Sequence, residues 1–359
     1  MPKIKVLEIV SGLGLGGAEK ALISRLKYEP SAVESTILNI RPQIDSLKLP
    51  DTLSYLENSG NFLQKISYMN RKVRELKPNI VIVRTPADVI RLAMIKTFFL
   101  TQIYLVFEAH SNFVTKKKYF RRAFEILFSV ASSQLNLIIA VSEAVKNGPL
   151  CRSKAAVKVC YLGSDITIGN VFFDEADKVK FLFIGRMVDV KRPLWLIERV
   201  DKLRSRLEIK EHCLTIVGSG PLLEKAKDLV LARGLSDYIL FAGEQSDVVP
   251  YLLKHNYLVS CSENEGLPIT FYEAKLAGLR IIATPSGGGQ EICNENDFVT
   301  LGFSEDEFED VLFKALTGPI PSKDERIETS SASAWMSAEV CANSYYKTLL
   351  DSFESGDRE

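Results

Sequence analysis

The stretch SENEGLPITFYEA (residues 262–274) decides how the second half of the chain is interpreted. It follows a run rich in apolar residues at 256–261, which predicts a strand buried on both faces of a parallel sheet. Pro268 suits the first turn of a helix, so Glu265 falls in the preceding loop and Glu273 about one and a half turns into the helix. Because ligands of parallel sheets bind where the strands end, this unit predicts a ligand site.

The loop and the helix start carry groups that suit a nucleotide sugar. The free N–H groups around Ile269 and Thr270 would face a phosphate. Glu273 can accept hydrogen bonds from ribose hydroxyls, and Glu265 from hydroxyls of the sugar. The surrounding glycine, proline and strand argue against the alternative, a chance pair of carboxylates. The donor-binding residues expected here are Gly266, Leu267, Ile269, Thr270 and Glu273.

Two further turns follow apolar strands in this half of the chain. In FIGRMVDVKRP (183–193), Arg186 and Lys191 stand at a strand-to-helix turn, where two cations can neutralise a diphosphate and stabilise it as a leaving group. The alternative is a solvated basic turn. In IVGSGP, Gly218 and Gly220 would let a base or ribose approach the backbone.

Short apolar runs alternate with amphipathic helical stretches along all 359 residues. This alternation predicts β-α-β crossovers and therefore two doubly wound α/β sheets. The length suits two domains of about 150–200 residues. The expected strands are 4–10, 35–40, 79–83, 103–107, 136–141 and 157–162, then 179–185, 213–218, 238–242, 256–261, 280–284 and 297–301.

The net charge of zero conceals an asymmetry between the halves. Residues 1–165 carry 24 Lys and Arg against 13 Asp and Glu, so the remainder of the 45 and 45 carries 21 against 32. The excess of basic residues in the first half hints at an anionic surface as its partner. It also supports a domain boundary near residue 165, followed by a linker at 165–178.

A glycine-rich run, SGLGLGGAE (11–19), follows the first expected strand. Gly12, Gly14 and Gly17 fit the dinucleotide fingerprint, which brings a phosphate close to a helix N-terminus. The second strand lacks the terminal acidic residue that holds a ribose, and only Arg41 keeps an NADP interpretation open. A glycine turn with a structural role is the other alternative.

Several classes of protein and site are not expected. No run of about 18 apolar residues exists, and the start MPKIKVLEIV does not resemble a signal peptide, so a cytoplasmic protein is predicted. The six cysteines form no C-x-x-C pair and the three histidines are dispersed, so buried thiols and no metal site are expected. We expect neither a cofactor nor a nucleic-acid partner.

Together these motifs resemble the retaining glycosyltransferases of family 4, also called glycosyl transferases group 1, over nearly the whole chain. That resemblance implies the GT-B fold, two Rossmann-like domains with a cleft between them. The implied parts are an acceptor-binding domain at 1–165, a donor-binding domain at 166–335, and a C-terminal helix at 336–359 that packs back on the first domain. The matching pieces are GGAE (16–19), EAH (108–110), VS (141–142), LGSD (162–165), GR (185–186), Lys191, VGSGP (217–221), FAG (241–243), the E-x7-E segment (265–273), GG (288–289) and Glu291.

The resemblance also implies roles for single residues. Arg186 and Lys191 bind the donor diphosphate, Glu265 binds the transferred sugar, and Glu273 binds the nucleotide ribose. His110 matches an active-site histidine near the transferred sugar, although a lone histidine at a strand end is usually structural.

Other implied features concern the first domain and the mechanism. The backbone at Gly16 and Gly17 lies near the diphosphate or the acceptor. At 162–165 the chain has Leu-Gly-Ser-Asp, where the family commonly has Asn-Gly-Val-Asp. This difference puts in doubt whether the domain junction contacts the substrate. The leaving phosphate assists attack by the acceptor hydroxyl on the same face of the sugar, and no metal is needed.

The predicted function is therefore transfer of a sugar from a nucleotide-diphosphate sugar to a glycan or lipid-linked acceptor. We expect this transfer to belong to bacterial surface polysaccharide or glycolipid synthesis. A UDP-sugar donor is favoured over GDP-mannose. The alternatives are an enzyme similar to UDP-sugar 2-epimerase and a catalytically silent subunit that binds nucleotide sugars.

A basic and aromatic segment follows His110. Phe120, Phe124, Leu127 and Phe128 share one helical face, beside a cluster of positive charge. The pattern predicts a helix that docks on an anionic membrane, with peripheral attachment to the inner face of the cell membrane. The alternative is a core-facing helix with a solvated basic end. The residues expected to bind the membrane are Lys116, Lys117, Lys118, Arg121 and Arg122.

Overall fold

Two compact units make up the chain: residues 1–163 together with 338–359, and residues 164–337. They are called unit 1 and unit 2 below. The computed structural model describes residues 2–11, 16–40, 54–55, 60–98, 102–111, 118–168, 178–207 and 212–356, and for 54–55 and 118–123 it describes the backbone alone. The boundaries fall two residues away from those expected, and residues 169–177 of the expected linker lie outside the described ranges.

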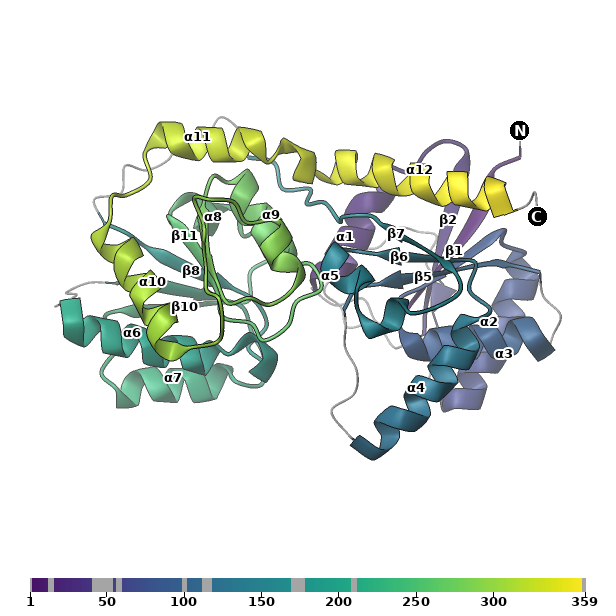
Figure 1. The fold of residues 1–359 in the computed structure, drawn as a ribbon, viewed down its shortest axis with the longest axis horizontal. Helices are drawn as coiled ribbons and strands as arrows, with labels where there is room; N and C mark the ends of the chain where they lie inside the picture. The colour runs from purple at the N-terminus through teal and green to yellow at the C-terminus, as the bar shows by residue number, and fades with distance from the viewer. Residues whose placement is uncertain are drawn as a thin grey trace. The chain divides into compact units, whose positions relative to one another are not determined.

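Unit 1 contains a parallel sheet with the strand order β3-β2-β1-β4-β5-β6-β7 (Figure 1). Its middle strands are almost wholly apolar and buried on both faces, as in the IVIV sequence of β4. This burial is typical of parallel strands that are covered by helices on each side. The strands are β1 (Ile4–Val10), β2 (Val33–Asn39), β3 (Ser54–Tyr55), β4 (Ile80–Val83), β5 (Tyr104–Ala109), β6 (Leu137–Ala140) and β7 (Ala156–Val159).

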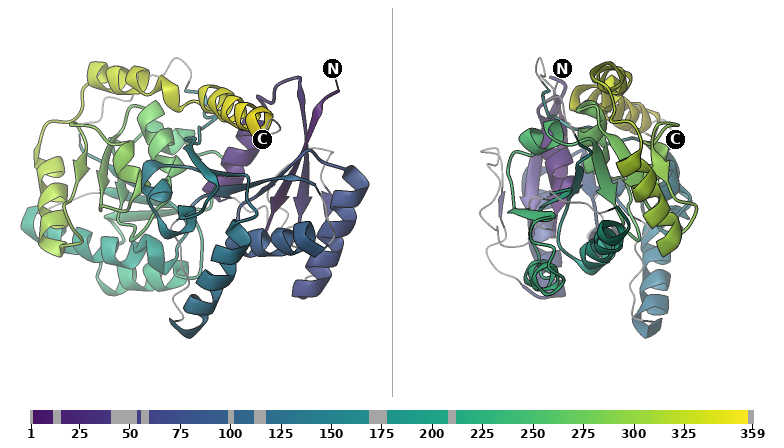
Figure 2. Two further views of the ribbon diagram at one scale, coloured as in Figure 1. Left: turned by 45° about the vertical axis from the view of Figure 1, so that its right-hand side comes forward. Right: turned by 90° about the vertical axis from the view of Figure 1, so that its left-hand side faces the viewer.

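Helices cover both faces of this first sheet. The face formed by Val6, Ile82 and Val106 packs against Tyr345 and Leu349 of the last helix. Figure 1 and the left view of Figure 2 show α2 and α3 on the opposite side of the sheet from α12. The helices are α1 (Gly17–Leu26), α2 (Phe62–Leu76), α3 (Pro86–Phe98), α4 (Lys118–Ser132), α5 (Glu143–Lys146) and α12 (Ala338–Gly356).

Local capping explains where one of these helices begins and ends. Asn61 accepts from the backbone N–H of Gln64 at 3.0 Å, and Gln64 accepts in return from the N–H of Asn61 at 2.8 Å. This reciprocal capping box satisfies two N–H groups at the start of α2. The helix ends at Lys77, which adopts the left-handed conformation (φ 46°) common at helix C-termini.

Unit 2 contains a second parallel sheet with the order β10-β9-β8-β11-β12-β13. Figure 1 shows α8 and α9 on the other side of this sheet from α6 and α7. The strands are β8 (Phe181–Ile184), β9 (Leu214–Val217), β10 (Ile239–Gly243), β11 (Tyr257–Ser260), β12 (Arg280–Ala283) and β13 (Phe298–Val299). The helices are α6 (Pro193–Leu207), α7 (Leu223–Ala232), α8 (Val249–Leu253), α9 (Ile269–Leu276), α10 (Glu305–Thr317) and α11 (Lys323–Ala332).

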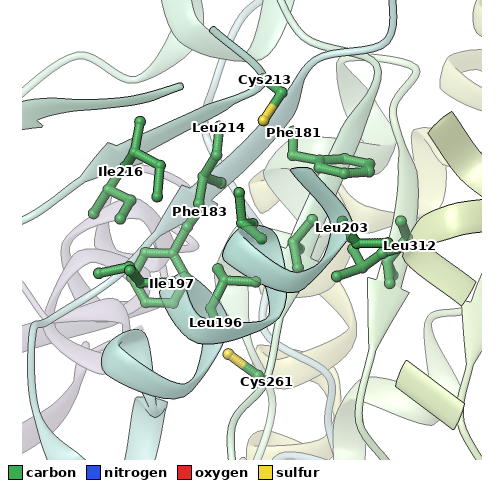
Figure 3. Close-up of a cluster of buried hydrophobic side chains, with 14 of the residues drawn as sticks. Phe181, Phe183, Leu196, Ile197, Leu203, Cys213, Leu214, Ile216, Cys261 and Leu312 are labelled. Carbon is green, nitrogen blue, oxygen red and sulfur yellow. The ribbon is translucent and has the colours of Figure 1, made fainter. Parts of the chain in front are cut away.

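The core of unit 2 lies between β8, β9 and the helices α6, α7 and α10 (Figure 3). Phe181 and Phe183 of β8 point into it, and Leu196 of α6 and Leu312 of α10 pack from the helical side. Cys213 and Cys261 lie in this apolar layer as free, buried thiols, as expected. The layer fixes β8 and β11, whose ends carry the candidate site.

The predicted fold class, two doubly wound α/β sheets, is confirmed. Each of the twelve expected strands overlaps an observed one. The strand β3 was not predicted, because two residues are too short to show a periodic pattern. Among the described residues, no helix is long and apolar enough to cross a membrane, and no cluster of three His, Cys, Asp or Glu side chains could hold a metal.

Candidate functional site

Two loops meet at the carboxyl ends of the neighbouring strands β8 and β11 in unit 2. The backbone N–H of Glu263, after β11, donates to the carbonyl of Val190, after β8, at 2.9 Å. The thiol of the buried Cys261 lies 3.5 Å from the carbonyl oxygen of Lys191. These contacts hold the Lys191 backbone against the β11 loop.

Lys191 and Glu265 form an ion pair between Nζ and Oε1. The residues are 74 positions apart in sequence, and both were predicted as site residues. Their side chains are 22% and 12% exposed, so solvent or a ligand can reach the pair. Arg186 lies on the same β8 loop and is exposed. The structure therefore brings Lys191 and Glu265 into contact at a sheet edge where ligands bind in this class of fold.

Backbone contacts fix the position of Glu265. Its N–H donates to the carbonyl of Ser286 at 2.6 Å, and its own carbonyl accepts from the N–H of Gly288 at 3.2 Å. Gly287 adopts φ +97°, and a Cβ there would lie 2.7 Å from the Glu265 carbonyl oxygen. A residue with a side chain would therefore disturb the backbone beside Glu265.

The glycines after β9 allow two loops to pack closely. Gly218 has φ +140°, and a Cβ there would lie 2.0 Å from the carbonyl oxygen of Gly185. Gly220 has φ +148°, and its Cβ would lie 2.7 Å from the carbonyl oxygen of Met187. Both positions thus require glycine for the approach of the β8 and β9 loops. Their predicted contact with a nucleotide stays a prediction.

The helix α9 begins one residue later than the proline predicted to open it, with Pro268 as the N-cap. Glu273 is its fifth residue and is 6% exposed. Gly266, Leu267 and Ile269 are buried, and Thr270 is half-buried. The first N–H groups of any α-helix lack intrahelical acceptors, so this end of α9 offers donors to an anion.

Unit 1 places the remaining predicted residues at two positions. Gly16 is the N-cap of α1 and Gly17 its first residue, so both stand at a helix N-terminus. Gly12 and Gly14 lie outside the described residues. His110 directly follows β5, and its Nε2 lies 2.6 Å from Oε1 of Glu108.

Glu108 belongs to a buried network of charged side chains that the sequence did not predict. Arg25 of α1 contacts Glu8 at 2.7 Å and Glu108 at 2.9 Å. Arg84, just after β4, contacts Glu8 at 2.7 Å and Glu108 at 3.1 Å. The hydroxyl of Tyr345 in α12 donates to Oε2 of Glu108 at 2.7 Å. This buried network comprises Glu8, Arg25, Arg84, Glu108 and Tyr345.

The protonation of the buried network follows from its pairing. Burial alone would raise the pKa of Glu108, but the guanidinium groups of Arg84 and Arg25 outweigh it and hold that pKa well below its usual range. Burial would likewise lower the pKa of Arg25, and the carboxylates of Glu8 and Glu108 reverse that shift. Glu108 and Arg25 are therefore ionised.

Residues 170–332 match the family model of Glycosyl transferases group 1. This segment is therefore similar to that family. It corresponds to nearly all of unit 2, and it includes Lys191, Glu265 and α9. The match supports the enzyme class predicted from the sequence, a glycosyltransferase.

Curated relatives match different parts of the chain. The GDP-mannose-dependent alpha-(1-6)-phosphatidylinositol monomannoside mannosyltransferase of Mycobacterium tuberculosis is 31% identical over 144 residues, which are 37% of this chain and 37% of that protein. Another relative is matched over 20% of its length, so the chain spans about a fifth to two fifths of these relatives. The capsular polysaccharide biosynthesis glycosyltransferase CapH of Staphylococcus aureus is 24% identical over 85% of this chain and 86% of its own.

A solved structure shares the fold outside the group 1 segment as well. Anabaena HepE, crystallised in complex with UDP and glucose, superposes with a TM-score of 0.76 at 15% identity. The match covers 96% of this chain and 99% of HepE. At this identity the likeness concerns the fold, and it extends the GT-B architecture from the group 1 segment to unit 1.

The predicted membrane segment needs one correction. Phe128 of α4 is buried and packs edge-on against Phe107 of β5, with ring centroids 5.7 Å apart, so it faces the core and not a membrane. Among the side chains of α4 that are described, the exposed apolar ones are Ile126, Leu127 and Val130, and of these Leu127 belongs to the predicted face. Lys116 and Lys117 lie outside the described residues, and for Lys118, Arg121 and Arg122 only the backbone, at the start of α4, is described.

Sequence reasoning missed the residues that surround His110. One signal was available, because Glu8 and Glu108 interrupt the apolar strands VLEIV and LVFEA, and Arg84 follows IVIV. A charged residue in a strand that is otherwise buried requires a partner of opposite charge. The pairing of Arg25 with these carboxylates could be found only from the fold, because Arg25 and Glu108 are 83 positions apart in sequence.

Proposed function

We propose that this protein is a retaining glycosyltransferase that moves a sugar from a nucleotide-diphosphate donor to a glycan or lipid-linked acceptor in surface polysaccharide or glycolipid synthesis. The observation that carries the proposal is the Lys191–Glu265 ion pair, which stands in a group 1 segment beside the start of α9. A cation, a carboxylate and free helix N–H groups there match the phosphate, the sugar hydroxyls and the ribose of one ligand.

The ion pair suggests how the donor enters. The donor diphosphate binds Nζ of Lys191 in place of Glu265. The Glu265 carboxylate can then accept hydrogen bonds from the sugar. Arg186 on the same loop adds a second positive charge. Glu273, in the first turns of α9, accepts from the ribose hydroxyls. Lys191 is the residue that changes partner, because a phosphate offers it more negative charge than one carboxylate does.

The proposed reaction retains the configuration of the anomeric carbon. The acceptor oxygen forms a bond to the anomeric carbon as the bond from that carbon to the phosphate oxygen breaks on the same face. The proton of the acceptor hydroxyl passes to the leaving phosphate. Lys191 and Arg186 stabilise the negative charge that develops on the diphosphate, which is the electrostatic work of the site. With two cations on the protein, we propose that no metal cofactor is required.

We favour a UDP-sugar as donor. The crystal structure of HepE contains UDP and glucose, and this supports uracil as the base. The M. tuberculosis relative is named for GDP-mannose and a phosphatidylinositol acceptor, which keeps GDP-mannose as the second candidate and supports a lipid-linked acceptor.

The acceptor proposal extends to the membrane surface. Exposed Ile126, Leu127 and Val130 follow a basic stretch on α4, and this combination suits the inner face of an anionic membrane. The protein would then be cytoplasmic and peripheral. A soluble glycan acceptor would not need this surface.

A thermal-shift screen tests the donor proposal. The full chain is mixed with UDP-glucose, UDP-galactose, UDP-N-acetylglucosamine, GDP-mannose and NADPH, each as a separate sample. A ligand that binds the native state alone raises the unfolding midpoint. We expect at least one UDP- or GDP-sugar to raise it, with less effect on Lys191→Ala. A rise with NADPH alone, or with none of the sugars, would overturn the proposal.

A further inference from the structure

The imidazole of His110 contacts a carboxylate that can accept hydrogen bonds but cannot donate one. Its Nε2 lies 2.6 Å from Oε1 of Glu108, a side chain that is 2% exposed. The other oxygen, Oε2, receives hydrogen bonds from Arg25 at 2.9 Å, Arg84 at 3.1 Å and Tyr345 at 2.7 Å. With two guanidinium groups against it, this carboxylate stays ionised and holds no proton to donate.

The tautomer of His110 follows from this contact. Because the carboxylate cannot donate, the hydrogen between the two groups must sit on Nε2 of His110. In the neutral imidazole, Nδ1 then carries a lone pair and is a hydrogen-bond acceptor. His110 is 17% exposed and stands at the carboxyl end of β5, the edge where ligands of parallel sheets bind.

The guanidinium groups of the buried network keep the proton on His110. Glu8 pairs with the same two guanidinium groups, so the set carries two positive and two negative charges. Arg25 also stacks on the ring of Tyr345, with its Cζ 3.7 Å from the ring centroid. Transfer of the proton from His110 to Glu108 would leave two guanidinium groups facing a single carboxylate, which the buried setting opposes.

We propose that Glu108 is a positioning residue that fixes His110 in its Nε2–H tautomer, so that Nδ1 accepts a hydrogen bond from a hydroxyl of the substrate. The tautomer follows from unit 1 alone. The substrate contact rests on the proposed function. The hydroxyl belongs to either the donor sugar or the acceptor, since both present the same chemistry to Nδ1.

Nitrogen NMR of the ligand-free, full-length protein tests the tautomer without any assay of activity. The chain has three histidines, so ¹⁵N-labelled imidazoles give few signals, and His110→Gln identifies one of them. His255 is an internal control with the opposite tautomer. Its Nδ1 lies 2.6 Å from the carbonyl of Tyr251, which must accept, and its Nε2 lies 2.7 Å from the hydroxyl of Thr215.

We expect the neutral His110 signal to show hydrogen on Nε2 and the His255 signal to show hydrogen on Nδ1. Glu108→Gln should convert His110 to a mixture, because an amide can also donate to Nε2. Tyr345→Phe is the matched control: it removes a hydrogen bond to Oε2 of the same carboxylate and should leave the His110 tautomer unchanged. A wild-type His110 with hydrogen on Nδ1 would overturn the proposal.

Kinetics test the substrate contact, with UDP-glucose and GDP-mannose as donors. For a donor that the wild type uses, Glu108→Gln should lower kcat by about tenfold or more. Glu108→Asp keeps the charge but shortens the reach to Nε2, so it gives the same result if the glutamine variant folds poorly. Tyr345→Phe should stay within about threefold of wild type.

The Michaelis constants assign the hydroxyl. A KM that rises for the donor places it on the donor sugar, and a KM that rises for the acceptor places it on the acceptor. Unchanged kcat and KM in both Glu108 variants would contradict the substrate contact, even with the expected NMR result. No turnover of any donor by wild type would instead count against the proposed function, and the NMR result would still decide the tautomer.

Discussion

Unit 1 and unit 2 each hold paired charged side chains beside the strands of a parallel sheet, but in opposite settings. In unit 1, Glu8, Arg25, Arg84 and Glu108 are nearly all buried and each contacts two partners of opposite charge. In unit 2, the Lys191–Glu265 ion pair is partly exposed. A closed, buried network holds one geometry, whereas an accessible pair can exchange a partner for a ligand. The comparison therefore separates side chains that position from side chains that bind.

The energetic expectation differs in the same way. Removing one partner of a buried ion pair leaves an uncompensated charge in the interior, which costs about 3–5 kcal/mol. An exposed pair contributes about 0–1 kcal/mol, because solvent screens it. Substitutions in the two units should consequently separate effects on stability from effects on activity.

The largest expected effect is on the stability of unit 1. Arg25→Met should lower the free energy of unfolding by about 3–5 kcal/mol, because Glu8 and Glu108 lose a shared partner inside the core. Lys191→Met, the matched change in unit 2, should cost less than about 1 kcal/mol. Urea unfolding followed by circular dichroism measures both. Equal losses in the two variants would remove the distinction between the units.

A buried neutral histidine should make unit 2 sensitive to acid. Burial lowers the pKa of His255 to about 4, from an ordinary value of 6.5. Because the folded pKa is the lower one, the unfolded state takes up a proton first, and stability is lost as the pH falls from 6.5 to 4. The loss is about 3 kcal/mol.

Fluorescence can follow this loss, since both tryptophans, Trp195 and Trp335, lie in unit 2. We expect His255→Gln to flatten the pH dependence between 6.5 and 4. A wild-type slope that persists in His255→Gln would assign the titration to another group.

The third effect concerns catalysis in unit 2. Lys191→Ala and Arg186→Ala should each lower kcat/KM by at least about tenfold, near 1.4 kcal/mol, while the fold is kept. Lys227→Ala is the matched control, because Lys227 pairs with Glu224 on the surface of α7 at 2.8 Å. Steady-state kinetics close to wild type for both site variants would show that this basic turn is merely solvated.

Much of this comparison could be foreseen in unit 2 and little of it in unit 1. Lys191 and Glu265 stand at strand ends with glycine and proline beside them, and strand ends of one parallel sheet meet at one edge. Glu8 and Arg84 carry no such local pattern, and Tyr345 joins them from the far end of the chain. The pairing of residues so distant in sequence depends on packing, which no local spacing records.

The prediction of which face of α4 is exposed was wrong for a related reason. Periodicity identified an amphipathic helix, but it does not say which side meets the sheet. Phe128 packs on β5, and Ile126, Leu127 and Val130 are exposed. Only the partner surface, Phe107 in β5, decides the orientation.

The smallest expected effect is on membrane binding, where each basic residue near an anionic surface contributes about 1 kcal/mol. Wild type should pellet with vesicles of anionic lipid at low salt and less at 1 M salt, where the Debye length falls to about 3 Å. Serine at Ile126, Leu127 and Val130 should weaken pelleting, and Leu231→Ser on α7 should not. A second variant carries glutamine at Lys116, Lys117, Lys118, Arg121 and Arg122. If wild type stays in the supernatant, or if both variants pellet as well as wild type, a soluble acceptor becomes the better proposal.

Calorimetric titration with UDP and GDP tests most directly whether unit 2 binds a nucleotide through the residues named. We predict that wild type binds one of the two and that Glu273→Ala weakens this binding by about tenfold or more, since its partner is the ribose. Glu265→Ala should stay within about threefold of wild type, because its partners are the sugar hydroxyls, which the bare nucleotide lacks. Equal losses in the two variants, or no binding of either nucleotide by wild type, would contradict the assignment of the site.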